Sequence, residues 1–335
     1  MGEFLLGIDI GGTKCAVVLG RAIAAGKMEI RGKRSFPTEN ERGADHVVAQ
    51  IFSNVEALLT HTGLCAKDLR AVGISCGGPL DELRGIVQNP PNLPGWDEVP
   101  IVKLVEARLG VPAKLQNDAN ACALAEWKYG AAKGFDNVVF LTFGTGLGAG
   151  LILDGKLYTG TKGMAGEVGH IRLADFGPVG YGKAGSLEGF CSGGGIAQLA
   201  QLKALECFQL GESCTFCPDI AHLRDISAKT VAEAAFAGDK TALEVFATCG
   251  RFLGRGLSVL IDILAPEIIV LGSVYERSRA LLVEEMQKAL AKEALPRSLE
   301  SCRVAAAGLG DEIGDYAALA VADVFFAGQE TGEKA

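Results

Sequence analysis

Two stretches of this chain carry the same pattern, about one domain length apart. Each has a short apolar run with one polar residue, a glycine turn containing threonine, and a second apolar run; they cover residues 6–19 and 140–153. This pattern predicts a strand, a tight loop and a strand in both places. Glycine turns expose backbone N–H groups in a concave loop, which suits an anion such as phosphate. We therefore expect two lobes that hold one polyphosphate, ATP, from both sides.

Two other phosphate-binding motifs do not fit. A dinucleotide fingerprint needs its glycines between a strand and a helix, with an acidic residue about 20 positions further on. Gly148 instead leads into an apolar run and the Asp154-Gly155 turn, which is typical of a hairpin. The chain also lacks the P-loop consensus. One such loop alone could equally be an ordinary hairpin turn, whereas a matched pair favours ligand binding.

Composition narrows the class of protein. A length of 335 residues suits two domains with a cleft between them. The net charge of −8 and the absence of a basic stripe argue against a nucleic-acid partner. No apolar run reaches membrane-spanning length, and the first strand follows Met1 too closely for a signal peptide. We therefore expect a cytoplasmic protein without a membrane partner, whose ten cysteines are small buried hydrophobes rather than disulfides.

Periodicity predicts the main elements and the domain limits. Strands are expected within residues 4–35 and at 69–75 and 113–116, and helices at 44–60, 101–109 and 314–326. The predicted first lobe comprises residues 1–117 and about 306–330, because the last apolar helix could return to it. The predicted second lobe comprises residues 118–305, and residues 331–335 are expected to form a tail.

The pair Asn117-Asp118 lies where a predicted strand ends and a helix begins. A carboxylate at such a strand end beside a cleft is well placed to take a proton from a sugar hydroxyl. The alternative is that Asp118 is only a helix N-cap, a common use of aspartate.

A second polar group contains Glu167 and His170 between glycines, followed by Glu188. These could bind a polyhydroxylated ligand, whose buried hydroxyls need partners, or form an ordinary salt bridge or backbone hydrogen bonds.

Five motifs then match a known family in order. They are Asp9-Ile10-Gly11-Gly12-Thr13-Lys14, Pro91-Asn92-Leu93-Pro94-Gly95-Trp96, Asn117-Asp118-Ala119-Asn120, Gly144-Thr145-Gly146-Leu147-Gly148 and Gly166-Glu167-Val168-Gly169-His170. Over nearly its whole length the chain resembles the ROK family of bacterial sugar kinases, within the actin-like ATPase superfamily. The resemblance implies an α/β, two-lobed, ribonuclease H-like fold with the active site in the interdomain cleft. It also implies ATP-dependent phosphorylation of a hexose, usually at the 6-hydroxyl, by a homodimer.

The resemblance further implies roles for particular residues. Asp118 is the expected general base, and Mg²⁺ is expected with ATP near Asp9. The expected sugar-pocket residues are Gly78, Asn92, Asn117, Asp118, Glu167, His170 and Glu188. The expected ATP-binding residues are Asp9, Gly11, Gly12, Thr13, Lys14, Thr145, Gly146 and Gly272.

The chain departs from the family in two places. The family's zinc-binding cysteines are missing, since Val179, Tyr181 and Ser186 stand in their positions. We expect no structural zinc, and expect apolar packing of Val179, Tyr181 and Leu187 to order residues 171–190 instead. The adenosine-side turn at Gly272 lacks a further glycine, which leaves the adenine contacts open. The cluster Cys207, Cys214, Cys217 and His222 matches no zinc spacing, so buried or loop cysteines are expected there.

Three functions stay open at this point. The leading one is a glucokinase-like enzyme, with an N-acetylglucosamine or N-acetylmannosamine kinase or a fructokinase as alternatives. A sugar-sensing regulator is disfavoured because no DNA-binding extension is seen. A catalytically dead sugar-binding protein is disfavoured because Asp9, Lys14 and Asp118 are present. The sequence decides neither the sugar nor the oligomeric state.

Overall fold

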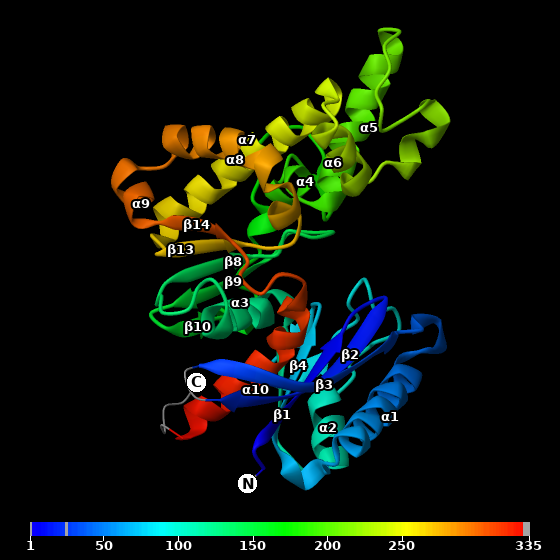
Figure 1. Ribbon diagram of the computed structural model, residues 1–335, viewed down its shortest axis with the longest axis vertical. Helices are drawn as coiled ribbons and strands as arrows, with labels where there is room; N and C mark the ends of the chain where they lie inside the picture. Colours follow the sequence, from blue (N-terminus) through cyan, green and yellow to red (C-terminus); the bar gives the residue numbers. More distant parts are fainter. Residues whose placement is uncertain (1, 24–25, 331–335) are drawn as a thin grey trace. The chain divides into compact units, whose positions relative to one another are not determined.

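The computed structural model describes residues 2–23 and 26–330 and contains two five-stranded sheets (Figure 1). Their strand orders follow one pattern, β3-β2-β1-β4-β7 and β10-β9-β8-β13-β14. In the first sheet, β1 (Phe4–Ile10), β2 (Lys14–Ile23) and β3 (Lys27–Pro37) are antiparallel neighbours. The strands β4 (Leu69–Cys76) and β7 (Ala113–Asn117) run parallel to β1. The repeated order confirms the duplicated strand–loop–strand pattern expected from the sequence.

Helices cover both faces of the first sheet. The helices α1 (Ala44–Thr62) and α2 (Ile101–Leu109) bury their apolar stripes in one core with residues of β1, β2, β4 and β7. The helix α10 (Ile313–Glu330) lies against the same sheet (Figure 1). It forms a second core with Leu5, Val18 and Ala71. Strands covered on both sides read as continuous apolar runs, and β4 is buried at seven of its eight positions. The helices and strands predicted in these regions are confirmed.

The second sheet uses shorter strands. The strands β8 (Val138–Leu141), β13 (Ile268–Leu271) and β14 (Arg303–Ala306) are parallel neighbours. The strands β9 (Ala149–Leu153) and β10 (Lys156–Tyr158) form the predicted antiparallel hairpin. Its turn residues Asp154 and Gly155 both have positive φ, 52° and 69°, as a tight two-residue hairpin turn requires.

Further helices follow the order of the chain. They are α3 (Asp118–Tyr129), α4 (Leu187–Phe190), α5 (Gly193–Gln209), α6 (Ala228–Phe236), α7 (Lys240–Leu264), α8 (Val274–Glu293) and α9 (Pro296–Ser301). Short two-residue strands form the pairs β5 (Leu80–Asp81) with β6 (Ile86–Val87) and β11 (Val179–Gly180) with β12 (Lys183–Ala184). None of the described helices is both long enough and apolar enough to cross a membrane.

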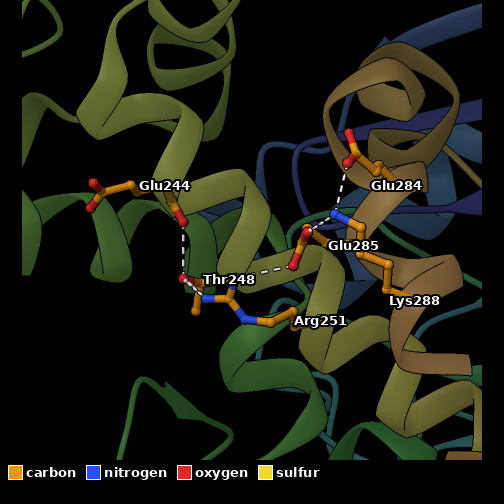
Figure 2. A network of polar contacts seen from close by, with 6 residues as sticks. All are labelled: Glu244, Thr248, Arg251, Glu284, Glu285 and Lys288. Carbon is orange, nitrogen blue, oxygen red and sulfur yellow. Dashed lines mark hydrogen bonds and ion pairs between the residues drawn. The ribbon is translucent and has the colours of Figure 1, made fainter. Parts of the chain in front are cut away.

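The long helices α7 and α8 pack along each other and are joined by a polar network (Figure 2). The Arg251 guanidinium on α7 donates to Glu285 on α8 at 3.3 Å and to the Thr248 hydroxyl at 3.0 Å. Lys288 donates to both Glu284 and Glu285. These side chains are largely solvent-exposed, so solvent screens the ion pairs and they contribute little to stability. The helix α7 also buries an apolar face that includes Leu253, Leu257 and Ile261.

Internal contacts gather the chain into two compact units. The first unit comprises residues up to 136, residues 150–165 and residues from 308 onward; the second comprises residues 137–149 and 166–307. The predicted division at residues 117/118 and 305/306 stays a prediction. The predicted tail, residues 331–335, lies outside the described residues.

Candidate functional site

In the first unit, the loop that joins β1 to β2 (residues 11–14, the first glycine loop) is held from one side by the segment after β3. The Thr38 hydroxyl donates to the Gly11 carbonyl at 2.6 Å, and the Thr38 N–H donates to the Thr13 carbonyl at 3.0 Å. Between them, the Asn40 side-chain amide donates to the Gly12 carbonyl. In a planar trans peptide the N–H points opposite to the preceding carbonyl. The N–H groups of Gly12 and Thr13 therefore face away from this segment, as an anion-binding loop requires.

The two glycines of this loop are required by crowding. A Cβ atom at Gly11 would lie 2.6 Å from the Lys14 carbonyl oxygen. A Cβ atom at Gly12 would lie 2.5 Å from the Asn92 carbonyl oxygen. Real Cβ atoms do not approach so closely, so any larger residue would displace the loop. The contact also shows that the first glycine loop packs directly on the segment that carries Asn92.

Asp9 lies at the end of β1, beside the first glycine loop, and pairs in register with Ser75 of β4. The pKa of Asp9 is raised to about 6, mainly because the carboxyl group is buried. A hydrogen bond from Ser75 opposes this rise, whereas the charges of Asp118 and Asp315 add to it. Lys33 forms an ion pair with Asp315 and offsets part of this negative charge. Carboxylate oxygens are the ligands that Mg²⁺ prefers, and a cation here would relieve the repulsion. The donor chemistry at Asp9 therefore fits the metal that the family implies.

Asp118 is the first residue of α3, and the N-cap is Asn117. The Asn117 side chain accepts a hydrogen bond from the Ala119 N–H at 3.0 Å, and one Asp118 oxygen accepts from the same N–H at 2.8 Å. The alternative that Asp118 is the N-cap is therefore wrong, because its neighbour performs that role. The Asp118 side chain is solvent-accessible, yet desolvation by the surrounding protein raises its pKa. A raised pKa suits a group that must accept a proton.

The turn at Gly77–Gly78 gathers three predicted sugar-binding side chains of the first unit. A Cβ atom at Gly77 would lie 3.4 Å from the Asn92 amide nitrogen and 3.8 Å from an Asp118 oxygen. A Cβ atom at Gly78 would lie 3.5 Å from the Asn117 amide nitrogen. Two amides and one carboxylate thus converge beside a turn without side chains. Amide and carboxylate groups are the partners that the hydroxyl groups of a sugar require when they are buried.

In the second unit, residues 144–148 (the second glycine loop) are held in a similar way by the start of α5. The Gly193 N–H donates to the Gly144 carbonyl at 2.7 Å, and the Gly194 N–H donates to the Thr145 carbonyl at 3.4 Å. By the same peptide geometry, the N–H groups of Thr145 and Gly146 face away from α5. Both predicted loops are therefore oriented by hydrogen bonds to their carbonyl groups.

The predicted acidic and imidazole residues of the second unit lie beside this loop. The Glu188 carboxylate accepts a hydrogen bond from the Leu147 N–H at 2.9 Å. Gly169 is wedged between Leu147 and Glu188, since a Cβ atom there would lie 2.1 Å from the Leu147 carbonyl. The side chains of Glu167 and His170 are exposed, and the two residues are linked through the His170 N–H and the Glu167 carbonyl.

Residues 171–190 are not ordered as the sequence suggested. Leu187 is fully buried, but Val179 and Tyr181 are 48% and 79% exposed, so the expected apolar packing of all three residues is wrong. Hydrogen bonds order the segment instead. The Gln198 side chain bonds both the N–H and the carbonyl of Val179, and the buried Ser186 hydroxyl caps α4. Polar contacts are needed here because Phe176, Val179 and Tyr181 are exposed and contribute little apolar packing.

The cysteine cluster and the adenosine-side turn also have defined places. Cys207, Cys214 and Cys217 are buried and free, as expected. Within residues 2–23 and 26–325, whose side chains the structure describes, no group of three or more His, Cys, Asp or Glu side chains is placed to hold a metal. Gly272 directly follows β13, and its N–H donates to the Leu141 carbonyl at 3.0 Å. The next residue, Ser273, has φ 48° and ψ −95°, a conformation that favours glycine.

Sequence reasoning missed the residues that orient the two glycine loops. Thr38 and Asn40 follow a strand and carry no motif, so their contacts with residues 11–13 could not be predicted. The run Ser192-Gly193-Gly194-Gly195 was a usable signal, because serine is a favoured N-cap and glycines allow close approach.

Comparison with known proteins identifies similar sequences and structures. The ROK family model matches residues 5–323. The glucokinase of Halalkalibacterium halodurans is 30% identical over 314 residues, 93% of this chain and 92% of that protein. The N-acetylmannosamine kinase of Salmonella typhimurium is 36% identical over 197 residues, 58% of this chain and 64% of that protein. The structure of a ROK family glucokinase from Streptomyces griseus in complex with glucose and AMPPNP has a TM-score of 0.73 and 30% identity, covering 96% of this chain and 98% of that one.

Proposed function

The chain belongs to the ROK family, and from this we infer that it is an ATP-dependent sugar kinase that phosphorylates a hexose. The relatives that match along most of the chain include glucokinases, which favours glucose as the substrate. The observation that carries the proposal is the group at the Gly77–Gly78 turn, where Asp118, Asn92 and Asn117 lie beside a glycine loop with oriented N–H groups.

We assign the chemistry to Asp118. Its free carboxylate oxygen accepts the proton of the sugar 6-hydroxyl. The hydroxyl oxygen attacks the γ-phosphorus at the same time, and ADP leaves. Phosphoryl transfer needs mainly positioning and charge neutralisation. We assign positioning of the sugar to Gly78, Asn92, Asn117, Glu167, His170 and Glu188.

We assign the ATP phosphates to Gly11, Gly12, Thr13, Lys14, Thr145 and Gly146, and place Gly272 on the adenosine side. Loop N–H groups and the Lys14 ammonium neutralise phosphate charge. Asp9 would hold Mg²⁺ directly or through water, and the ion would supply charge neutralisation on the phosphates. We also propose that the protein is a cytoplasmic homodimer, by analogy with the family.

A second candidate is an N-acetylhexosamine kinase, favoured by the match to the Salmonella typhimurium N-acetylmannosamine kinase. The two candidates differ in the group at the sugar's second carbon. A hydroxyl needs a buried hydrogen-bond partner, whereas an N-acetyl group needs additional apolar volume.

ADP release tests the proposal. The purified protein with ATP and Mg²⁺ is supplied with glucose, mannose, fructose, allose, N-acetylglucosamine or N-acetylmannosamine at millimolar concentration. We expect sugar-dependent ADP release that is highest with glucose. A preference for an N-acetylated sugar would select the second candidate, and no release with any sugar would reject the kinase proposal.

A further inference from the structure

We propose that Asn40 is a positioning residue that joins the first glycine loop to the sugar-binding segment and thereby couples sugar binding to nucleotide binding. This inference rests on the proposed function. The main supporting observation is that one side-chain amide donates hydrogen bonds to two carbonyl groups from segments distant in the sequence. The Asn40 Nδ2 group donates to the Gly12 carbonyl and, at 3.1 Å, to the Asn92 carbonyl.

The orientation of this amide is fixed by its partners. Both partners are carbonyl oxygens, which only accept, so the nitrogen of the amide must face them. Its two N–H groups suffice for one bond to each carbonyl. The Asn40 Oδ1 atom is buried and has no hydrogen-bond partner among the side chains and backbone that the structure describes, residues 2–23 and 26–325. Burying an acceptor without a partner is unfavourable, so the two hydrogen bonds from the amide nitrogen must offset this penalty.

The backbone around Asn40 holds it in place. Glu39 adopts a left-handed conformation with φ 51°, and its carboxylate bonds His46 and Gln50 on α1, each at 2.9 Å. The Gly43 N–H donates to the Asn40 carbonyl and closes the short turn of residues 40–42. Asn40 is therefore anchored to α1, while its side chain reaches the two ligand-binding segments.

Coupling follows from the contact between these segments. The missing Cβ of Gly12 would lie 2.5 Å from the Asn92 carbonyl oxygen, so the two segments cannot move closer together, and the two hydrogen bonds from Asn40 oppose their separation. The bond to the Gly12 carbonyl also sets the direction of the Thr13 N–H. A sugar that immobilises Asn92 therefore orders Asn40 and the glycine loop, and the nucleotide then binds with a smaller entropic penalty.

The test measures nucleotide affinity with and without sugar. Calorimetry gives the Kd of a non-hydrolysable ATP analogue with Mg²⁺, alone and at saturating concentration of the sugar that the wild type phosphorylates best. Asn40→Asp places an acceptor against both carbonyls, and Asn40→Ser removes the amide without adding charge. Arg42→Ala is the matched control, because Arg42 lies in the same turn and makes an exposed ion pair with Glu39.

We expect sugar to tighten nucleotide binding about 5–100-fold in the wild type and in Arg42→Ala, as coupled sites commonly do. In the Asn40 variants that fold, the ratio of the nucleotide Kd without sugar to the Kd with sugar should fall toward one. A wild-type ratio of one, or an unchanged ratio in folded Asn40→Ser, would overturn the inference. Loss of wild-type turnover on every sugar would instead reject the proposed function, so the two failures are distinguishable.

Discussion

At the scale of single residues, Asp118 shows how a neighbour frees a side chain for chemistry. Its position at the start of a helix suggested a capping role, but Asn117 caps α3. One Asp118 oxygen still accepts a helix N–H, while the other faces the Gly77 turn. The carboxylate is thereby oriented by the helix and remains available to a ligand.

Replacement of Asp118 by Asn tests this role. The variant keeps the size of the side chain and leaves the Asn117 cap in place, but it cannot accept the hydroxyl proton. We expect turnover to fall by roughly 10²–10⁴ while sugar affinity stays within a few-fold. Steady-state ADP release and sugar titration calorimetry measure the two quantities. Near-normal turnover would show that Asp118 is not the base.

Asp9 gives a pH-dependent prediction. Its pKa is about 6 in the folded protein, above the ordinary 3.8, so ionisation disfavours the folded state. The stabilisation by protonated Asp9 is complete below about pH 4 and is lost as the pH rises through 6. Asp9→Asn cannot ionise. It should therefore raise stability at pH 7.5, by up to about 3 kcal/mol, and change it little at pH 4.

Thermal unfolding without nucleotide or Mg²⁺ at both pH values measures this difference. The same variant should lose kinase activity, because the proposed metal-holding carboxylate is gone. Equal effects on Tm at the two pH values would contradict the assigned pKa.

At the scale of elements, hydrogen bonds to carbonyl groups decide what the glycine loops present. The segment of residues 38–40 holds one loop, and the first residues of α5 hold the other. Hydrogen bonds likewise order residues 171–190, where the family uses zinc. In each case hydrogen bonds between elements fix the conformation of the segment.

The absence of zinc is a prediction about residues 171–190. Val179 offers no ligand atom, and Tyr181 and Ser186 replace thiolates poorly, so we expect the protein to fold without a structural metal. Elemental analysis of protein purified without chelator should find far less than one zinc per chain. Stoichiometric zinc, or unfolding on addition of a strong chelator, would refute this.

The start of α8 carries a backbone prediction. Ser273 has positive φ, and its hydroxyl accepts a hydrogen bond from Arg277 at 2.8 Å. Glycine adopts this conformation without strain, whereas alanine does not. We expect Ser273→Gly to be about 1 kcal/mol more stable than Ser273→Ala, since both lose the hydroxyl. Chemical denaturation measures the free energy of unfolding of the two variants. An equal or lower stability of the glycine variant would show that the position is unstrained.

At the scale of the whole molecule, the same strand order occurs twice, and the end of the chain completes the first unit. The helix α10 lies on β1 and β4, with Ala317 to Ala322 all buried. Small residues on both elements allow this approach. The second core of the first unit therefore depends on a helix about 240 residues beyond β4 in the chain, so the first unit cannot complete its folding without the last helix.

Gly73→Ala tests this dependence. A Cβ atom at Gly73 would lie 1.9 Å from the Ala318 carbonyl oxygen, so α10 must move off the sheet. We expect a loss of more than about 3 kcal/mol or failure to fold, since overpacking against backbone cannot relax. Gly194→Ala is the control, because its added Cβ meets its nearest atom at an ordinary 3.5 Å. Similar urea midpoints for the wild type and Gly73→Ala would contradict the close packing of α10.

The sequence by itself determined the duplicated strand–loop–strand pattern, the helices α1, α2 and α10, and the position of Asp118 between a strand and a helix. These follow from periodicity and turn chemistry within a few neighbouring residues. Only the tertiary structure decided that Thr38 and Asn40 orient the first glycine loop and that Asn40 also reaches Asn92. Those bonds join residues 27, 28 and 52 positions apart. Contacts at such separations depend on how strands and helices pack, and local patterns do not encode that packing.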